Sequence, residues 1–173
     1  MNKLLLVLSL MIVLLSCSSE KRKPIYVDFD TDDEEYHYAR SGDDIIVPFR
    51  NDNGVKYVAV KVNGVGFDMI FDTGCSGALI SVAEANYLFQ KGKLTEEDFL
   101  GVVQSQIADG SIVEDMVVNL KEVIINDQIL CPNVKATVSS SIDAPLLLGN
   151  EILDRLATIT IDNENETLNF KLK

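Results

Sequence analysis

The most informative run of this sequence is Ile70-Phe71-Asp72-Thr73-Gly74-Cys75-Ser76-Gly77. An apolar, strand-like segment (67–71) leads straight into it, and the apolar residues 78–80 follow it. Asp and Gly are common turn residues, so the triplet Asp72-Thr73-Gly74 taken alone indicates only a strand that ends in a turn. Its surroundings add weight, because a hairpin with an Asp-Gly tip, a Leu-Leu-Gly segment and a short helix follow in that order.

Upstream of this run, the pattern predicts short strands joined by tight turns. Ile45–Phe49 and Val58–Val62 are apolar and rich in β-branched residues, which favour strands. Between apolar runs, Asn63-Gly64 is a hairpin signal. We therefore expect the run around Asp72 to leave a strand that is already part of a hairpin.

Downstream, one helix and several further strands are expected. Ser81 and Glu84 have the spacing of a capping box, which predicts a helix from about Val82 to Phe89. A second short helix is expected over 150–156. Strands are expected in the remaining apolar segments, namely 102–107, 117–125, 134–138, 146–148, 158–161 and 167–170. The chain is therefore predicted to be mainly β, with one or two short helices.

The N-terminus has the pattern of an export signal. Lys3 precedes an apolar run, 4–15, that is too short to span a bilayer comfortably, and Leu14-Leu15-Ser16-Cys17 ends it. This ending resembles a bacterial lipobox, which implies cleavage before Cys17 and attachment of lipid to its sulfur. An ordinary signal peptide with an incidental cysteine is the alternative. We prefer the lipobox, which predicts a lipid-anchored protein in the bacterial cell envelope, on the periplasmic or outer surface side of a membrane.

Three segments follow from this interpretation: a signal peptide (1–16), a lipidated cysteine with a polar tether (17–43) and one domain (44–173). The tether carries many charges, so it has too little apolar surface to offset the entropy lost on ordering. The single histidine, His37, lies in it. A mobile histidine is a poor catalytic base, because proton transfer requires fixed geometry.

The composition excludes several classes of function. A formal net charge of −12 argues against nucleic acid or anionic lipid as a partner, since like charges repel. No run resembles a phosphate-binding glycine loop or a paired Cys-x-x-Cys zinc site, so neither a cofactor nor a metal is expected. Beyond Cys17, Cys75 and Cys131 could form a disulfide or remain free thiols, and we prefer free thiols.

On the residues quoted above, the segment from about Ile45 to Leu172 resembles the retropepsin-like aspartic peptidases, single-domain relatives of pepsin that work as homodimers. Bacterial lipoproteins with such a domain are the most similar kind. The resemblance implies a closed β-barrel of the acid protease fold, with one lobe in each chain. It also implies an aspartic endopeptidase that needs no cofactor and acts on polypeptides.

The resemblance assigns roles to two groups of residues. Asp72 would be the catalytic carboxylate, Thr73 would join a hydroxyl network across the dimer, and Gly74 would let a backbone N–H approach the carboxylates. The active-site loop would comprise Thr73, Gly74, Cys75 and Ser76. The flap over the substrate would comprise Ala108, Asp109, Gly110 and Ser111. Cys75 departs from the usual Ala or Ser, and its oxidation beside the carboxylates could impair activity.

The mechanism requires two chains, because the sequence has a single Asp-Thr-Gly motif. Peptide hydrolysis needs a base for water and an acid for the carbonyl, and two adjacent carboxyls that share one proton supply both. We therefore expect a symmetric homodimer in which Asp72 of each copy meets its counterpart on the two-fold axis. Two alternatives are a non-catalytic peptide-binding or assembly module on the same fold, and a structural β-domain without a site.

Overall fold

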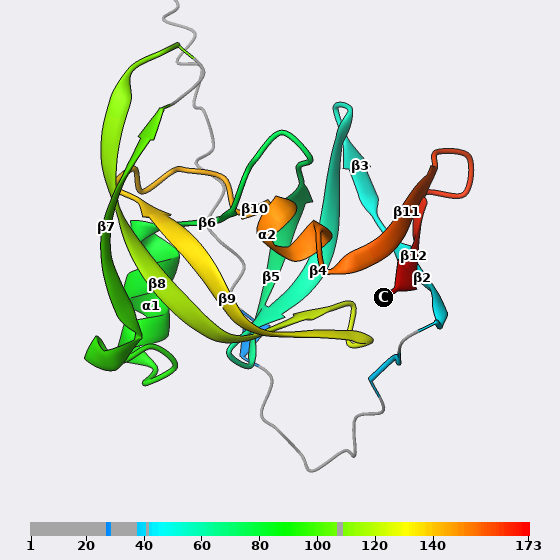
Figure 1. Ribbon diagram of the computed structural model, residues 1–173, viewed down its shortest axis with the longest axis horizontal. Coiled ribbons are helices and arrows are strands. Elements are labelled where there is room, and N and C mark those ends of the chain that lie inside the picture. Colours follow the sequence, from blue (N-terminus) through cyan, green and yellow to red (C-terminus); the bar gives the residue numbers. More distant parts are fainter. Residues whose placement is uncertain (1–26, 29–37, 41, 107–108) are drawn as a thin grey trace, which may run out of the picture.

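The structure is a computed structural model, and it describes residues 27–28, 38–40, 42–106 and 109–173 (Figure 1). The predicted signal peptide, Cys17 as the predicted site of lipid attachment, and His37 of the predicted tether lie outside these ranges. In the part of the chain that is described, no helix is long and apolar enough to cross a membrane.

Most of the described strands belong to one nine-stranded sheet. Its path runs through β1 (Val27–Asp28), β5 (Val65–Phe71), β10 (Leu147–Leu148), β6 (Ala78–Ser81), β9 (Ile129–Ser139), β8 (Ile112–Ile125), β4 (Val55–Val62) and β3 (Arg50–Asp52), with β7 (Phe99–Gln106) paired to β8. Because β4 also pairs with β5, six strands (β5, β10, β6, β9, β8 and β4) close into a ring.

A second, three-stranded sheet consists of β11 (Leu156–Asp162), β12 (Thr167–Leu172) and β2 (Asp44–Pro48). Figure 1 shows this sheet at the right of the molecule, whereas the β7–β8 hairpin rises at the upper left. The predicted mainly β fold is confirmed by this arrangement. Within the segment predicted as a tether, Val27–Asp28 forms β1, which lies antiparallel to the start of β5.

Successive side chains of a strand point to opposite faces of the sheet, so every second residue can face the hydrophobic core. In β4, Val58, Val60 and Val62 are buried, and the residues between them are more exposed. The hairpin that joins β4 to β5 turns at Asn63-Gly64, where both residues have positive φ (49° and 84°), as tight hairpin turns require. The Asn-Gly signal therefore sets the register of the strand that ends at Asp72.

Helix α1 (Val82–Gln90) begins as the sequence predicts. The Ser81 hydroxyl accepts a hydrogen bond from the Ala83 N–H (3.0 Å), and the Glu84 carboxylate accepts one from the Ser81 N–H (3.1 Å). This reciprocal arrangement is a capping box. It fixes the direction in which the chain leaves β6, the strand after the Asp72 loop.

The second helix, α2 (Asn150–Leu153), is shorter than predicted, and the expectation that it reaches Leu156 is wrong. The Arg155 side chain donates hydrogen bonds to the carbonyls of Pro132 (2.5 Å) and Asn133 (3.1 Å). Leu156 already pairs with Leu172 as the first residue of β11. Contacts with a distant strand therefore end the helix where local preference would let it continue. A one-turn 3-10 helix, η1 (Glu96–Asp98), completes the elements.

Candidate active site

Asp72 follows directly after β5, and its position is fixed by a strand from the far end of the chain. β10 runs parallel to β5, with Leu147 opposite Ile70 and Leu148 opposite Phe71. The Ile70 N–H donates to the Leu146 carbonyl (2.8 Å), and the Asp72 N–H donates to the Leu148 carbonyl (3.2 Å). The backbone of Asp72 is therefore tied to the Leu-Leu-Gly segment that the sequence singles out.

The loop after Asp72 folds back on the Asp72 carboxylate. The Gly74 N–H donates a hydrogen bond to Asp72 Oδ1 (2.8 Å), and the Cys75 N–H donates to the Asp72 carbonyl (3.3 Å). A Cβ atom on residue 74 would lie only 3.1 Å from Asp72 Oδ1, so glycine at this position avoids crowding the carboxylate. The loop thus brings a backbone N–H to the carboxylate, the role that the resemblance implies for Gly74.

Gly149 is the residue that permits this loop to pack against β10. A Cβ atom at this position would lie 1.9 Å from the Gly77 carbonyl oxygen and 2.7 Å from the Cys75 carbonyl oxygen. Both atoms belong to the backbone, so no side-chain movement could make room. Glycine is required here by close approach of two backbones rather than by an unusual φ.

Asn150 is a site residue that the sequence reasoning missed. Its backbone N–H donates to the Cys75 carbonyl (2.9 Å), and its side-chain Nδ2 donates to the Thr73 carbonyl (3.2 Å). Asn150 is the first residue of α2 and directly follows Gly149. Its place after the Leu-Leu-Gly segment is the one sequence signal that could have drawn attention to it.

The predicted active-site residues lie together in one surface loop, between β5 and β6 and next to α2 (Figure 1). Asp72 and Cys75 are partly exposed, and Thr73, Gly74 and Ser76 are exposed. Cys75 and Cys131 are both free thiols in the structure, as we expected.

The predicted flap is the tip of the β7–β8 hairpin, whose last pair is Gln106 and Ile112. The Ser111 N–H donates to Asp109 Oδ1 (2.8 Å), and Gly110 has a positive φ of 85°. Hydrogen bonds from Ser111, chiefly from its side chain, lower the pKa of Asp109 below its ordinary value. Ala108 lies outside the described residues. Among those that are described, no hydrogen bond joins the flap tip to the Asp72 loop.

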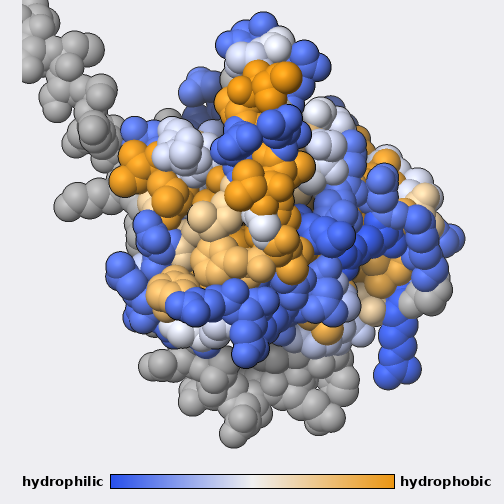
Figure 2. All heavy atoms as spheres, turned by 60° about the vertical axis from the view of Figure 1, so that its left-hand side comes forward, coloured by the Kyte–Doolittle hydropathy of each residue, from blue (hydrophilic) through white to orange (hydrophobic). Residues whose placement is uncertain are grey.

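Apolar side chains gather on this hairpin and beside its base (Figure 2). Val102, in the middle of β7, and Ile112, beside the tip, are more than two-thirds exposed (69% and 68%). Four more large apolar residues of the hairpin are exposed: Phe99, Leu100, Val103 and Met116. A hairpin with this much exposed apolar surface can cover a ligand that has apolar side chains of its own.

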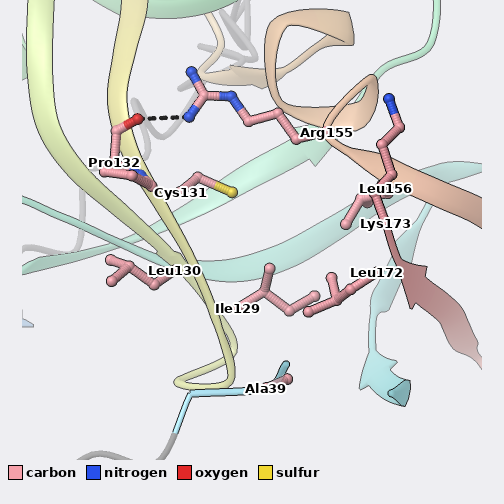
Figure 3. A pocket seen from close by; sticks show the side chains of 9 residues that line it. All are labelled: Ala39, Ile129, Leu130, Cys131, Pro132, Arg155, Leu156, Leu172 and Lys173. Carbon is pink, nitrogen blue, oxygen red and sulfur yellow. Dashed lines mark hydrogen bonds between the residues drawn. The ribbon is translucent and has the colours of Figure 1, made fainter. Parts of the chain in front are cut away.

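A pocket of about 270 Å³ lies between the start of β9 and the end of β12, and none of the Asp72 loop residues lines it (Figure 3). Cys131 lies on its wall and is 2% exposed. Burial raises the pKa of the Cys131 thiol, and the nearby Arg155 charge opposes that shift only in part. The Arg155 guanidinium is engaged with the Pro132 carbonyl (2.5 Å). The thiol is thus kept protonated, and a protonated thiol is a weak nucleophile.

Among the described residues, no group of three or more His, Cys, Asp and Glu side chains is placed so that it could hold a metal ion. The chemistry that the loop itself offers is that of a partly exposed carboxylate with a backbone donor directed at it. Such a carboxylate can accept or give a proton.

Comparison with known proteins agrees with this geometry. Residues 58–155, more than half of the chain, match the family described as "gag-polyprotein putative aspartyl protease". No curated protein matches the sequence significantly. Among solved structures, a retropepsin-like aspartic protease from Rickettsia conorii is similar with a TM-score of 0.52 and 23% identity, over 78% of this chain and 94% of that one.

The similarity to the Rickettsia structure shows a shared fold, and the match over residues 58–155 includes both the Asp72 loop and the Gly149–Asn150 contact. The chain therefore belongs to the gag-polyprotein aspartyl protease family, and its fold is retropepsin-like.

Proposed function

We propose that this protein is an aspartic endopeptidase in which Asp72 from each of two chains forms the catalytic pair. The observation that carries the proposal is that Leu148 and Asn150, from a distant segment, hold the backbone of the partly exposed Asp72 loop, in which the Gly74 N–H donates to Asp72 Oδ1 (2.8 Å). Membership of an aspartyl protease family supports the same chemistry. The β7–β8 hairpin, which is paired from Phe99 to Gln106 as a flap would require, favours the proposal over a structural domain that has no site.

The proposed reaction uses the two carboxyls as a base and an acid. The ionised Asp72 accepts a proton from water, while the protonated Asp72 of the other chain donates its proton to the carbonyl oxygen of the peptide. The water oxygen bonds to the carbonyl carbon. The Asp72 that took the water proton then gives it to the amide nitrogen, and the other Asp72 takes a proton back from a hydroxyl of the tetrahedral intermediate. The carbon–nitrogen bond breaks, which leaves a carboxylic acid and an amine. The pair must hold one proton between its two carboxyls, so cleavage should be faster in mild acid than at neutral pH.

A homodimer is part of this proposal, because one chain contributes one such loop. The two copies of Asp72 would face each other across a two-fold axis, with an extended peptide between the loops and the flaps. Anchoring through lipid on Cys17, at a membrane of the bacterial cell envelope, is also a proposal. It rests on the sequence pattern of residues 1–17, and confinement to a membrane would favour dimers by raising the effective concentration.

The test uses residues 18–173, which include β1 but lack the lipid site, with a mixed peptide library and a reducing agent. Asp72→Asn should lower the cleavage rate at least about a hundredfold, because it removes the group that exchanges the proton. Asp68→Asn is the matched control. Asp68 lies on the same strand, is exposed, and pairs with Arg50 (3.3 Å). This control should cleave like the parent chain.

The dimer is tested by mixing. An excess of Asp72→Asn chains should suppress the activity of the parent chain, since mixed dimers hold only one carboxylate; an excess of Asp68→Asn should not. Equal cleavage by the parent and Asp72→Asn would refute the proposed mechanism, as would activity strictly proportional to concentration in a protein that sediments as a monomer. Peptide binding without cleavage at any pH would favour the alternative, a non-catalytic binding module.

A further inference from the structure

One peptide group links Asn150 to the Asp72 carboxylate. The Asn150 side chain donates to the carbonyl of Thr73 (3.2 Å), and the N–H of Gly74 donates to Asp72 Oδ1 (2.8 Å). That carbonyl and that N–H are the two ends of a single peptide bond. The peptide unit is planar and resists twisting, so a contact that fixes the direction of its oxygen also fixes the direction of its hydrogen.

Asn150 is itself held in place, as a residue that orients another must be. Its N–H donates to the Cys75 carbonyl (2.9 Å), and its carbonyl accepts from the Asp154 N–H (2.8 Å) in the turn of α2. Gly149, the preceding residue, lies against the backbone of the same loop. The Asn150 side chain therefore extends from a fixed backbone toward the Thr73 carbonyl.

The chemistry of the contact requires a hydrogen-bond donor at this position. A carbonyl oxygen only accepts hydrogen bonds, so the side chain beside it must present a donor. Asparagine presents an NH₂ group, whereas an ionised aspartate of the same shape would present only lone pairs. Hydrogen bonds in a chain polarise one another, so donation to the Thr73 carbonyl also strengthens donation by the Gly74 N–H.

We propose that Asn150 is a positioning residue for Asp72, which fixes the peptide between Thr73 and Gly74 so that its N–H stays directed at the carboxylate. This inference rests on the proposed function of Asp72. Asn150 would not touch the substrate. Its effect would pass through the orientation of a group that the reaction uses, and small losses of orientation lower a rate without weakening substrate binding.

The test compares Asn150→Asp with Gln128→Glu in residues 18–173. The Gln128 side chain, which is also partly exposed, donates to the Ile46 carbonyl (3.4 Å), so this substitution removes the same kind of contact in a different part of the fold. Three quantities are measured: the chemical shift of the Gly74 amide proton, kcat and KM for a peptide, and the urea midpoint of unfolding. Asn150→Ala, which adds no charge, replaces Asn150→Asp if that variant fails to fold.

For Asn150→Asp we expect the Gly74 amide proton to move upfield and kcat to fall about five- to tenfold with KM nearly unchanged, as loss of one hydrogen bond would produce. Gln128→Glu should lower the urea midpoint slightly but leave the Gly74 signal and kcat as they are. An unmoved Gly74 signal in the Asn150 variant overturns the inference, and so does a moved signal with an unchanged kcat. If the parent chain cleaves nothing, the proposed function fails, and the Gly74 signal still decides whether Asn150 orients the peptide.

Discussion

Two loops of this protein have the same local structure and different surroundings. In the active-site loop, the Gly74 N–H donates to Asp72 Oδ1, and in the flap tip the Ser111 N–H donates to Asp109 Oδ1. Both hydrogen bonds span two residues, and both measure 2.8 Å. They are turns of the kind that aspartate forms with its own backbone.

The surroundings separate the two loops. The Asp72 loop joins β5 to β6, and β10 lies between these two strands and pairs with both. Hydrogen bonds that join the loop to Leu148 and Asn150 hold its backbone. The Asp109 turn ends a hairpin that extends into solvent, and Asp109 is exposed. The same local turn therefore occurs in both loops. Only the Asp72 loop is also held by a second segment of the chain, residues 146–150.

The largest effect is expected from adding one methyl group at Gly149, because it should remove the support that distinguishes the Asp72 loop from the flap tip. In Gly149→Ala, the new Cβ would meet two backbone oxygens of the Asp72 loop, and β10 would have to move away from it. Overpacking of a fixed backbone costs about 3 kcal/mol or more of unfolding free energy. We expect a greatly lowered urea midpoint together with loss of cleavage.

Gly77→Ala is the matched control for that experiment. Gly77 lies in the same loop, yet a Cβ there would meet no atom within 4 Å. It should retain the parent midpoint to within about 1 kcal/mol of unfolding free energy. If both variants are equally stable, the close approach at Gly149 does not hold the loop.

A third aspartate, Asp98, shows a carboxylate with a purely structural role and should give an intermediate effect. It accepts from the N–H and hydroxyl of Thr95 (2.8 and 2.9 Å) and lies 3.3 Å from the Lys121 ammonium. Burial alone would raise its pKa, but these donors outweigh burial and hold the pKa below its ordinary value of 3.8. Asp98→Asn should cost about 1–2 kcal/mol of unfolding free energy at pH 7.

The sign of the pH dependence follows from the direction of that shift. Because the folded pKa is below the unfolded one, the stabilisation is complete above the unfolded pKa and disappears as pH falls through the folded value. The difference in urea midpoint between the parent and Asp98→Asn should therefore shrink below about pH 4. Asp143→Asn, at an exposed loop position, should show no such difference. A constant difference between pH 3 and pH 7 would contradict the assignment.

The smallest effect is expected at the flap tip. Asp109→Ala removes the acceptor of the turn, but the tip has few neighbours to disturb, so the urea midpoint should stay unchanged. Peptide cleavage should slow by no more than about fivefold, the effect of one ordinary hydrogen bond. Asp109→Asn keeps an acceptor oxygen and should cleave like the parent. A loss of stability comparable to that of Gly149→Ala would mean that the two loops are equally supported.

Local signals were enough to predict much of the fold. Asn63-Gly64 identified the hairpin before the Asp72 loop, and the Ser81 and Glu84 spacing identified the start of α1. Both features depend on residues that are close in sequence, so the sequence pattern contains the full interaction. The roles of Asp72 and of the loop residues from Thr73 to Ser76 came instead from the family resemblance, and they stay predictions.

The parts of the fold and of the candidate site that were not predicted depend on contacts between distant parts of the chain. The early end of α2 follows from Arg155 reaching the carbonyls of Pro132 and Asn133, which its local sequence does not reveal. Asn150 escaped notice because an asparagine at the start of a helix is unremarkable by itself. Its contact with Thr73 joins residues 77 positions apart, and only the folded chain brings them together.

The two-residue strand β10 has a consequence for the order of events during folding. The Asp72 loop has its supports only when residues 146–150 pack against it, and α1 and the long β7–β9 strands lie between the two segments in the sequence. Bringing the Asp72 loop and residues 146–150 together costs chain entropy, and the local turns between them do not offset this cost. A nascent or C-terminally shortened chain would therefore contain Asp72 without an assembled active site. Peptidase activity, once present, would report that the whole domain has been made and folded.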